Sequence, residues 1–425
     1  MSHDVRHRAG WLPADQSRLE EWLEGHVRRV DAAGEKPLRP SVAALADLVR
    51  SEPVVGMLVH RMLEQRPETR EYHSRHIRDV DHLLALMNGV LELAPEYGEE
   101  NVTLPMGALL DWAMGTPAGF AAFRDPRVNA ALKGVLREWC EFLDSPGSLY
   151  VLNDGPAGWK GEKAVADVGM DQFQHDPDDE HWGFSSWNDF FVRRFREGER
   201  PVAAPEDDAV VVSACESTPF ALRTDVQRRE PFWLKGQPYS LHEMLDGDDL
   251  VDRFVGGTVY QAFLSATDYH RWHAPVAGTV VSARVVDGTY YSEASSVGSD
   301  AADESPSSQG YLAHVATRAI VTLRADNPAL GHVAFVAVGM SDVSSCVTVV
   351  EPGQHVAKGE EIGYFQFGGS THCLVFEPGA LSSSPSRPSR SRPRLAPGPC
   401  TSSRTWRRPG PDPAVPHSAA VWRHA

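Results

Sequence analysis

The stretch Phe367-Gly368-Gly369-Ser370-Thr371-His372 lies between two runs that are typical of β-strands, residues 361–365 before it and 373–376 after it. Two glycines ahead of Ser-Thr let the backbone bend where a side chain would forbid the conformation. Such a bend would allow the Ser370 hydroxyl to attack the Gly369 carbonyl. β-Elimination from the resulting ester would cut the chain and leave a pyruvoyl group on residue 370. Taken alone, Gly-Gly-Ser-Thr more often marks a plain glycine-containing bend, so other motifs must decide.

Other motifs precede this stretch along the chain. They are Ser-Trp-Asn-Asp-Phe-Phe-Val-Arg-Arg-Phe (186–195), Ala-Cys-Glu-Ser (214–217), Asp-Tyr-His-Arg-Trp-His-Ala-Pro (268–275), Val-Ala-Val-Gly-Met (336–340) and Lys-Gly-Glu-Glu-Ile-Gly-Tyr-Phe (358–365). In this order they resemble the phosphatidylserine decarboxylase family of pyruvoyl-dependent enzymes. That family carries Phe-Phe-x-Arg, a Pro-x-Asp-Gly-like segment, Tyr-His-Arg-x-His-x-Pro and a terminal Gly-Ser-Thr. The resemblance covers about residues 186–380, and the shared order of weak motifs makes it specific.

The resemblance implies a role for each candidate site residue. Ser370 would be the nucleophile and the pyruvoyl precursor, with cleavage between Gly369 and Ser370, and His273 would activate it. His270 would act in the later decarboxylation. The family usually has an aspartate where this chain has Glu216, which reaches one methylene farther and is expected to orient His273. Structural hydrogen bonds for the histidines, and a surface carboxylate or ion-pair partner for Glu216, remain the alternatives.

The implied cofactor is the pyruvoyl group derived from Ser370. Its carbonyl would form a Schiff base with a substrate amine and act as an electron sink while carbon dioxide leaves. The substrate must therefore carry its amine on the carbon that bears the carboxylate. No metal is required, and the sequence lacks His-Glu-x-x-His, Gly-x-x-x-x-Gly-Lys and Gly-x-Ser-x-Gly. His73, His76 and His82 are expected on a solvated helical face, and the acid pair Glu360-Glu361 in a solvated turn.

The composition is that of a cytoplasmic protein. A length of 425 residues favours two domains, and 42% hydrophobic residues suffice for ordinary cores. No apolar run approaches the length of a membrane span, and no secretory signal is recognisable at the N-terminus. The cysteines form no Cys-x-x-Cys pair, which argues against a disulfide framework or a structural zinc site. They are Cys140, Cys215, Cys346, Cys373 and Cys400.

The periodicity predicts an α+β protein of two domains and a tail. Residues 1–185 are expected to form a helical N-terminal domain, because apolar residues recur at three- and four-residue spacing. The expected helices cover 16–30, 41–63, 81–93 and 128–143. Residues 186–381 are expected to form a mainly antiparallel β catalytic domain, because short β-branched runs alternate with turn residues. The expected strands include 257–265, 278–286, 318–323 and 332–338, and residues 292–309 are expected to form a loop over the site.

The tail, residues 382–425, differs in composition from the rest of the chain. Eight arginines and one acid give it a charge of +7, which leaves −24 on the preceding residues out of a total of −17. Rich in Arg, Pro and Ser, it is predicted to be disordered or the product of a frameshift. The acidic body disfavours nucleic acid and anionic lipid headgroups as partners.

The substrate remains open between two classes. The family name favours phosphatidylserine, which would give phosphatidylethanolamine in phospholipid biosynthesis. The long helical N-terminal region instead resembles the soluble, tryptophan-decarboxylase-like branch, which favours a free aromatic amino acid such as tryptophan. A homo-oligomer of cleaved chains is a further hypothesis. The alternative to an enzyme is an uncleaved, inactive pseudoenzyme or binding protein, because the C-terminus is altered.

Overall fold

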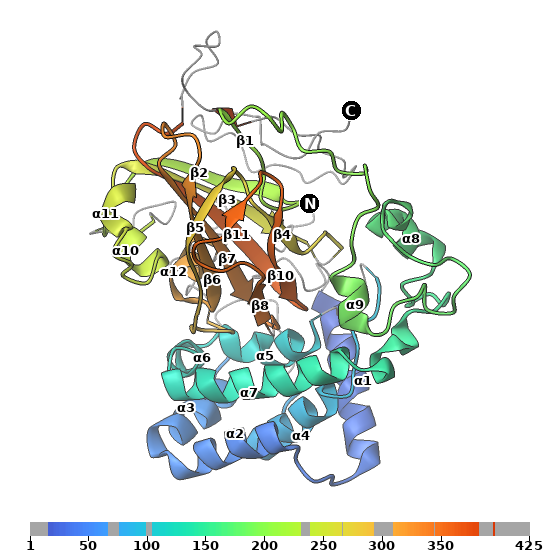
Figure 1. The fold of residues 1–425 in the computed structure, drawn as a ribbon. Helices are drawn as coiled ribbons and strands as arrows, with labels where there is room; N and C mark the ends of the chain where they lie inside the picture. Colours follow the sequence, from blue (N-terminus) through green and yellow to red (C-terminus); the bar gives the residue numbers. More distant parts are fainter. Residues whose placement is uncertain are drawn as a thin grey trace, which may run out of the picture.

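The computed structural model describes residues 16–66, 76–98, 104–230, 239–265, 267–292, 309–343, 345–381 and 394–395. Figure 1 shows helices α1 to α7 gathered on one side of a large β-sheet. This arrangement confirms the α+β class, with a helical N-terminal region followed by a mainly antiparallel β region. Most of the loop expected at residues 292–309 and all but two residues of the tail lie outside the described residues.

The N-terminal region consists of helices that mostly begin at a proline. They are α1 (Gln16–Ala33), α2 (Pro40–Ser51), α3 (Pro53–Glu64), α4 (Val80–Val90), α5 (Pro105–Met114), α6 (Pro117–Ala122) and α7 (Pro126–Leu143). Proline suits the first turn because its missing N–H has no partner there. The single run expected over 41–63 is two helices. Pro53 disfavours the helical conformation at Glu52, which adopts φ −105° and ψ 101°.

Short helical segments connect the two regions and cover the sheet. They are η1 (Pro146–Val151), α8 (Glu162–Val168), η2 (Met170–Gln172), α9 (Trp187–Phe191), α10 (Leu241–Met244), α11 (Val251–Phe254) and α12 (Gln309–Val315). Helix α9 contains the Phe-Phe pair of the first motif, and Ser186 caps it by accepting a hydrogen bond from the Asp189 amide. The aromatic residues of α9 pack into the core of the helical region.

The main sheet has seven strands in the order β2-β3-β11-β7-β6-β5-β9, and every neighbouring pair among these described strands is antiparallel. They are β2 (Thr218–Val226), β3 (Gly257–Leu264), β5 (Gly278–Val286), β6 (Arg318–Ala325), β7 (His332–Met340), β9 (His355–Val356) and β11 (Gly369–Phe376). A second sheet has the order β4-β10-β8, formed by β4 (Arg271–His273), β10 (Glu361–Gln366) and β8 (Ser345–Thr348). β1 (Val210–Val211) pairs in parallel with β12 (Arg394–Leu395). The six strands expected from the sequence correspond to β3, β5, β6, β7, β10 and β11.

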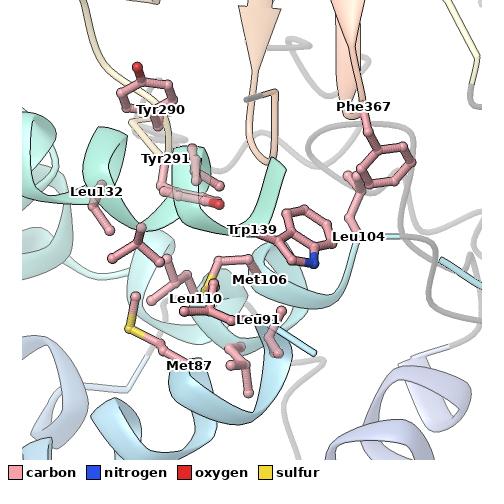
Figure 2. Close-up of a cluster of buried hydrophobic side chains, with 14 of the residues drawn as sticks. Met87, Leu91, Leu104, Met106, Leu110, Leu132, Trp139, Tyr290, Tyr291 and Phe367 are labelled. Carbon is pink, nitrogen blue, oxygen red and sulfur yellow. The ribbon is translucent and has the colours of Figure 1, made fainter. Parts of the chain in front are cut away.

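One hydrophobic cluster contains residues of both the helical region and the β region. Phe367, which directly precedes the Gly-Gly pair, packs with Trp139 of α7, and Tyr290 and Tyr291 of the β region join the same cluster. Figure 2 shows Phe367 beside Trp139, with the two tyrosines near the same helix. The chain around the Gly-Gly-Ser-Thr stretch is therefore in direct contact with the N-terminal helices.

Two expectations about polar residues are wrong in part, at His82 and at Glu361, whereas Glu360 is exposed as expected. His82 is buried in α4, and its Nδ1 accepts a hydrogen bond from the Arg78 amide, because the helix turns this side chain toward the core. Glu361 begins β10 and accepts a hydrogen bond of 2.6 Å from Arg271 on the neighbouring strand. Among the described residues, no group of three or more His, Cys, Asp or Glu side chains could hold a metal ion. None of the helices described is long and apolar enough to span a bilayer.

Candidate active site

Ser370 lies near the start of β11, in the middle of the main sheet. It is opposite Leu264 on β3 and Gly339 on β7, and its side chain is fully buried. The Ser370 Oγ atom lies 3.5 Å from Nδ1 of His270. This distance is at the limit of a hydrogen bond, and catalytic hydrogen bonds are often long before the reacting geometry forms. The structure therefore brings the proposed nucleophile to one of the two predicted imidazoles.

The bend that the sequence predicts occurs at Gly368. This residue has φ +137°, a conformation that residues with a Cβ rarely adopt. A Cβ at this position would lie 2.3 Å from the amide nitrogen of Val343 and 2.6 Å from the carbonyl carbon of Asp342. Glycine is required here both by the backbone angle and by the neighbouring turn. Gly369 then starts β11, so the Gly369–Ser370 peptide is the first peptide of this strand and directly follows the bend.

His270 is fully buried, and aromatic rings hold its imidazole. The ring stacks on Phe191 of α9, with 4.1 Å between centroids and 22° between planes, and its edge meets Phe365 of β10. The His270 carbonyl accepts a hydrogen bond of 3.0 Å from the Phe365 amide, which fixes its backbone beside β10. The second phenylalanine of the Phe-Phe-x-Arg motif therefore positions the imidazole that faces Ser370.

His273, at the end of β4, has a different environment. Its Nδ1 lies 2.9 Å from the Gly359 carbonyl oxygen, and its Nε2 lies 3.1 Å from the Tyr269 hydroxyl. Because a carbonyl can only accept, Nδ1 carries the proton and Nε2 accepts from Tyr269. Burial lowers the pKa of His273, which favours this neutral form. Its role as the activating base is an expectation from the resemblance, and these contacts describe its resting state.

Glu216 forms an ion pair, which is the alternative that the sequence left open. Its carboxylate accepts a hydrogen bond of 3.0 Å from Arg200. Burial raises the pKa of Asp268 to about 7, and the charge of Glu216 contributes to the increase. Two carboxylates thus lie near one another beside the Tyr-His-Arg segment. The orientation of His273 by Glu216 stays a prediction.

Arg193, the arginine of Phe-Phe-x-Arg, has no role among the expectations from the sequence. It is buried and donates hydrogen bonds to the carbonyl oxygens of Thr267, at 2.7 Å, and Asp268, at 3.3 Å. Its guanidinium lies 4.4 Å from the ring centroid of Phe173, a cation–π contact. Burial lowers the pKa of Arg193 to about 10. Arg193 holds the backbone that leads into Tyr269 and His270, and the motif itself was the signal that could have identified it.

Comparison with known proteins identifies the class of protein that this fold and site define. Residues 187–393 match a family described as phosphatidylserine decarboxylase, and residues 39–168 match a second family with the same description. Decarboxylase iboD of Amanita muscaria is 42% identical over 301 residues, which is 66% of this chain and 86% of that protein. L-tryptophan decarboxylase of Psilocybe cubensis is 32% identical over 391 residues, 86% of this chain and 87% of that protein. Phosphatidylserine decarboxylase proenzyme 3 of Schizosaccharomyces pombe is 32% identical over 200 residues, 47% of this chain and 20% of that protein.

The chain belongs to the phosphatidylserine decarboxylase family and is a decarboxylase, a carboxy-lyase. The proenzymes of this family depend on a pyruvoyl group derived from a serine. The environment of Ser370 fits such a group: the serine is buried, the chain before it bends at Gly368, and an imidazole lies beside its hydroxyl.

Proposed function

We propose that this chain cuts itself between Gly369 and Ser370 and uses the pyruvoyl group formed on residue 370 to decarboxylate a free aromatic amino acid such as tryptophan. The observation that carries the proposal is the buried Ser370 hydroxyl, placed after the Gly368 bend and 3.5 Å from the imidazole of His270.

The cleavage uses only groups of the chain and water. Ser370 Oγ attacks the Gly369 carbonyl carbon and gives its proton to a base, for which the nearby His270 Nδ1 is the candidate supported by distance. The Gly369–Ser370 amide bond breaks and an ester forms. Loss of the Ser370 α-proton then breaks the Cβ–O bond and releases a Gly369 carboxylate. Hydrolysis of the remaining enamine releases ammonia and leaves the pyruvoyl group.

In the decarboxylation, the pyruvoyl group supplies a carbonyl that accepts the substrate amine and draws electrons from the bond to the leaving carbon dioxide. The residues of the chain provide the surroundings. Phe191 and Phe365 keep the His270 imidazole beside residue 370, where it can return a proton to the substrate α-carbon. The burial of residue 370 limits the access of water to this position.

The extent of the similarity supports a free aromatic amino acid as substrate. The tryptophan decarboxylases of Psilocybe cubensis and Psilocybe cyanescens align over 86% and 88% of this chain, which includes the helical N-terminal region. The phosphatidylserine decarboxylase proenzymes align over less of it: proenzyme 2 of Oryza sativa over 71% and the proenzyme of Clostridium novyi over 46%. The charge of −24 before the tail also disfavours approach to an anionic lipid surface. Phosphatidylserine is the second candidate, because both matching families carry that description.

Intact mass spectrometry of the purified protein tests the cleavage. We expect two fragments, of which the C-terminal one covers residues 370–425 and carries a pyruvoyl end. The Ser370→Ala variant should remain whole, and Ser51→Ala, at an exposed serine that ends α2, should be cut like the wild type. A wild-type protein that stays a single species of 46.7 kDa would contradict the proposal and favour an inactive pseudoenzyme.

Carbon dioxide release from the cut protein tests the substrate. Free L-tryptophan, L-phenylalanine and L-serine should be compared with phosphatidylserine vesicles at matched carboxylate concentration. We expect turnover of the aromatic amino acids and not of the vesicles, with Ser370→Ala as the blank. Turnover of the vesicles alone would assign the phospholipid reaction instead.

A further inference from the structure

A turn of the β region reaches into the N-terminal helices directly behind the proposed scission point. It follows β7 and consists of Ser341, Asp342 and Val343, with Ser341 at φ +51°. Asp342 is fully buried, yet it carries a carboxylate. A buried carboxylate needs hydrogen-bond donors to offset its lost hydration.

The donors to Asp342 come from two distant parts of the chain. The Met106 amide donates to Oδ2 at 3.1 Å, and the Tyr291 hydroxyl donates to Oδ1 at 2.9 Å. The Gly107 amide is a third donor. Burial raises the pKa of Asp342 to about 7, and the three hydrogen bonds act in the opposite direction. Asp342 therefore connects the β region to the N-terminal region through a set of specific polar contacts.

The contact with Met106 and Gly107 is a helix cap provided from outside the helix. These residues are in the first turn of α5, whose amides have no partner within the helix. The residue at the N-cap, Leu104, makes no side-chain hydrogen bond. A carboxylate at this position satisfies the free amides and is favoured by the helix dipole. A Cβ on Gly107 would lie 3.3 Å from Asp342 Oδ1, so glycine lets the carboxylate approach.

The same turn lies against the scissile segment. The Asp342–Val343 peptide is so close to Gly368 that a Cβ there would be 2.3 Å from the Val343 nitrogen. Met340, at the start of the turn, is the β7 partner of Gly369. The turn that caps α5 thus forms the surface against which the Gly368 bend is folded.

A second contact fixes the scissile segment from its other end. Phe367 is buried among the N-terminal helices, and its ring meets Trp139 of α7 edge-on, with centroids 5.4 Å apart and planes at 86° (Figure 2). The residue before the bend and the turn behind the bend are therefore both bound to the helical region. Glycine has wide backbone freedom, so one bent conformation at Gly368 persists only where the surroundings select it.

We propose that the N-terminal helical region is the platform that holds the scissile segment in its bent conformation, and that Asp342 is the positioning residue of this contact through its cap of α5. The inference rests on the proposed self-cleavage at Ser370 for its functional consequence. It assigns to the helical region a role in making the cofactor, separate from any contact with substrate.

The first experiment follows the self-cleavage of the full chain during cell-free synthesis, by the fraction cut at fixed times. We expect Asp342→Asn to slow cleavage at least tenfold, because the amide keeps one acceptor oxygen and leaves either the α5 amide or the Tyr291 hydroxyl without its acceptor. The matched control is Leu45→Ala on α2, which is buried and separated from the sheet by α7 (Figure 1). It should reduce the thermal stability at least as much and change the cleavage rate less than threefold. Equal slowing by both variants would assign the effect to general stability and overturn the proposal.

The second experiment measures the bend without the cleavage. In a Ser370→Ala background the chain stays whole, and hydrogen exchange of a peptide that covers residues 366–371 reports its protection. Asp342→Asn should speed this exchange about tenfold, while Leu45→Ala should leave it unchanged. Unchanged protection and a wild-type cleavage rate in Asp342→Asn would overturn the proposal. If the wild type is never cut but Asp342→Asn still speeds hydrogen exchange over residues 366–371, the platform role is supported and the proposed self-cleavage is contradicted.

A milder variant covers the case in which Asp342→Asn does not fold. Tyr291→Phe removes one hydroxyl donor to Asp342 and leaves the two α5 amides in place. We expect it to fold, to slow cleavage about threefold and to raise exchange over residues 366–371 to a similar extent. A Tyr291→Phe protein that matches the wild type in both measurements would contradict the role of Asp342.

Discussion

The two ends of β11 have the same neighbouring strands but different surroundings. Its C-terminal end, from Cys373 to Phe376, sends alternate side chains into two apolar clusters on the two faces of the sheet. Its N-terminal end carries Ser370, which is just as buried but faces His270, and it is preceded by a bend that is packed on the helical region. Burial and strand pairing are therefore common to both ends.

The Ser370 end therefore differs from the other end in the segments that contact it from outside the sheet. His270 comes from the segment before β4, Phe191 from α9, and the support of Gly368 from the turn after β7. The C-terminal end from Cys373 to Phe376, the apolar end, depends only on side-chain volume and on the hydrophobic pattern, which many sequences provide. The N-terminal end around Ser370, the polar end, requires several segments that are distant in the sequence to be arranged together. Residues in each of these segments can be substituted to test the comparison.

The largest effect is expected from replacing the imidazole at the polar end. His270→Asn keeps a polar group near Nδ1 but removes the base, and we expect self-cleavage to slow by about 10²–10⁴-fold. His273→Asn is the matched variant, because its amide can still donate to the Gly359 carbonyl, and it should slow cleavage less than about tenfold. Time courses of the cut fraction measure both. A larger effect of His273→Asn would support the assignment that the family resemblance implies.

The bend at Gly368 should be sensitive to a single methyl group. Gly368→Ala places a Cβ against the Val343 amide in a conformation with φ +137°. In a Ser370→Ala background, we expect the free energy of unfolding to fall by roughly 2–5 kcal/mol. Gly379→Ala, just after the apolar end, is the control: it has φ +75° but nothing within 4 Å of the added Cβ. Gly379→Ala should lower the free energy of unfolding by about 1–2 kcal/mol, measured by urea unfolding. Equal losses in the two variants would show that the 341–343 turn does not restrict the space at Gly368.

Much of the architecture could be predicted because it depends on local patterns. The spacing of apolar residues located α1, α4 and α7, and the β-branched runs located β3, β5, β6 and β7. The bend before Ser370 followed from two glycines at one position. The apolar period continues through Pro53, so the period alone predicts one helix where the restriction on Glu52 separates α2 from α3.

The partners within the site could not be predicted, because they depend on contacts between distant residues. His270 and His273 are three residues apart, and the sequence does not say which ring turns toward Ser370 once β4 begins between them. The cap that Asp342 places on α5 joins residues 236 positions apart. No local pattern distinguishes Asp342 from a surface acid. The same limit applies to Glu361: its local sequence predicts a solvated turn residue, and only the fold places Arg271 beside it.

The smallest expected effect concerns His372, which shares the Ser370 face of β11. It is fully buried beside Phe335 and Tyr260, and burial lowers its pKa to about 3. In the unfolded chain the imidazole binds a proton below about pH 6.5, whereas the folded chain excludes it. His372 therefore opposes folding as the pH falls from about 6.5 toward 3, by up to about 1.4 kcal/mol per pH unit, or about 2 kcal/mol between pH 6.5 and 5.

Urea unfolding at a series of pH values, again in the Ser370→Ala background, measures this contribution. Between pH 6.5 and 5, the unfolding free energy of His372→Leu should decrease by about 2 kcal/mol less than that of its parent. Leu374→Ala, two residues along the same face, should lower the unfolding free energy by about 2–5 kcal/mol at every pH and leave the slope unchanged. If His372→Leu keeps the parent's slope, the imidazole must become protonated inside the fold. The polar end of β11 would then be more open to water than its burial implies, and the contrast with the apolar end would be correspondingly weaker.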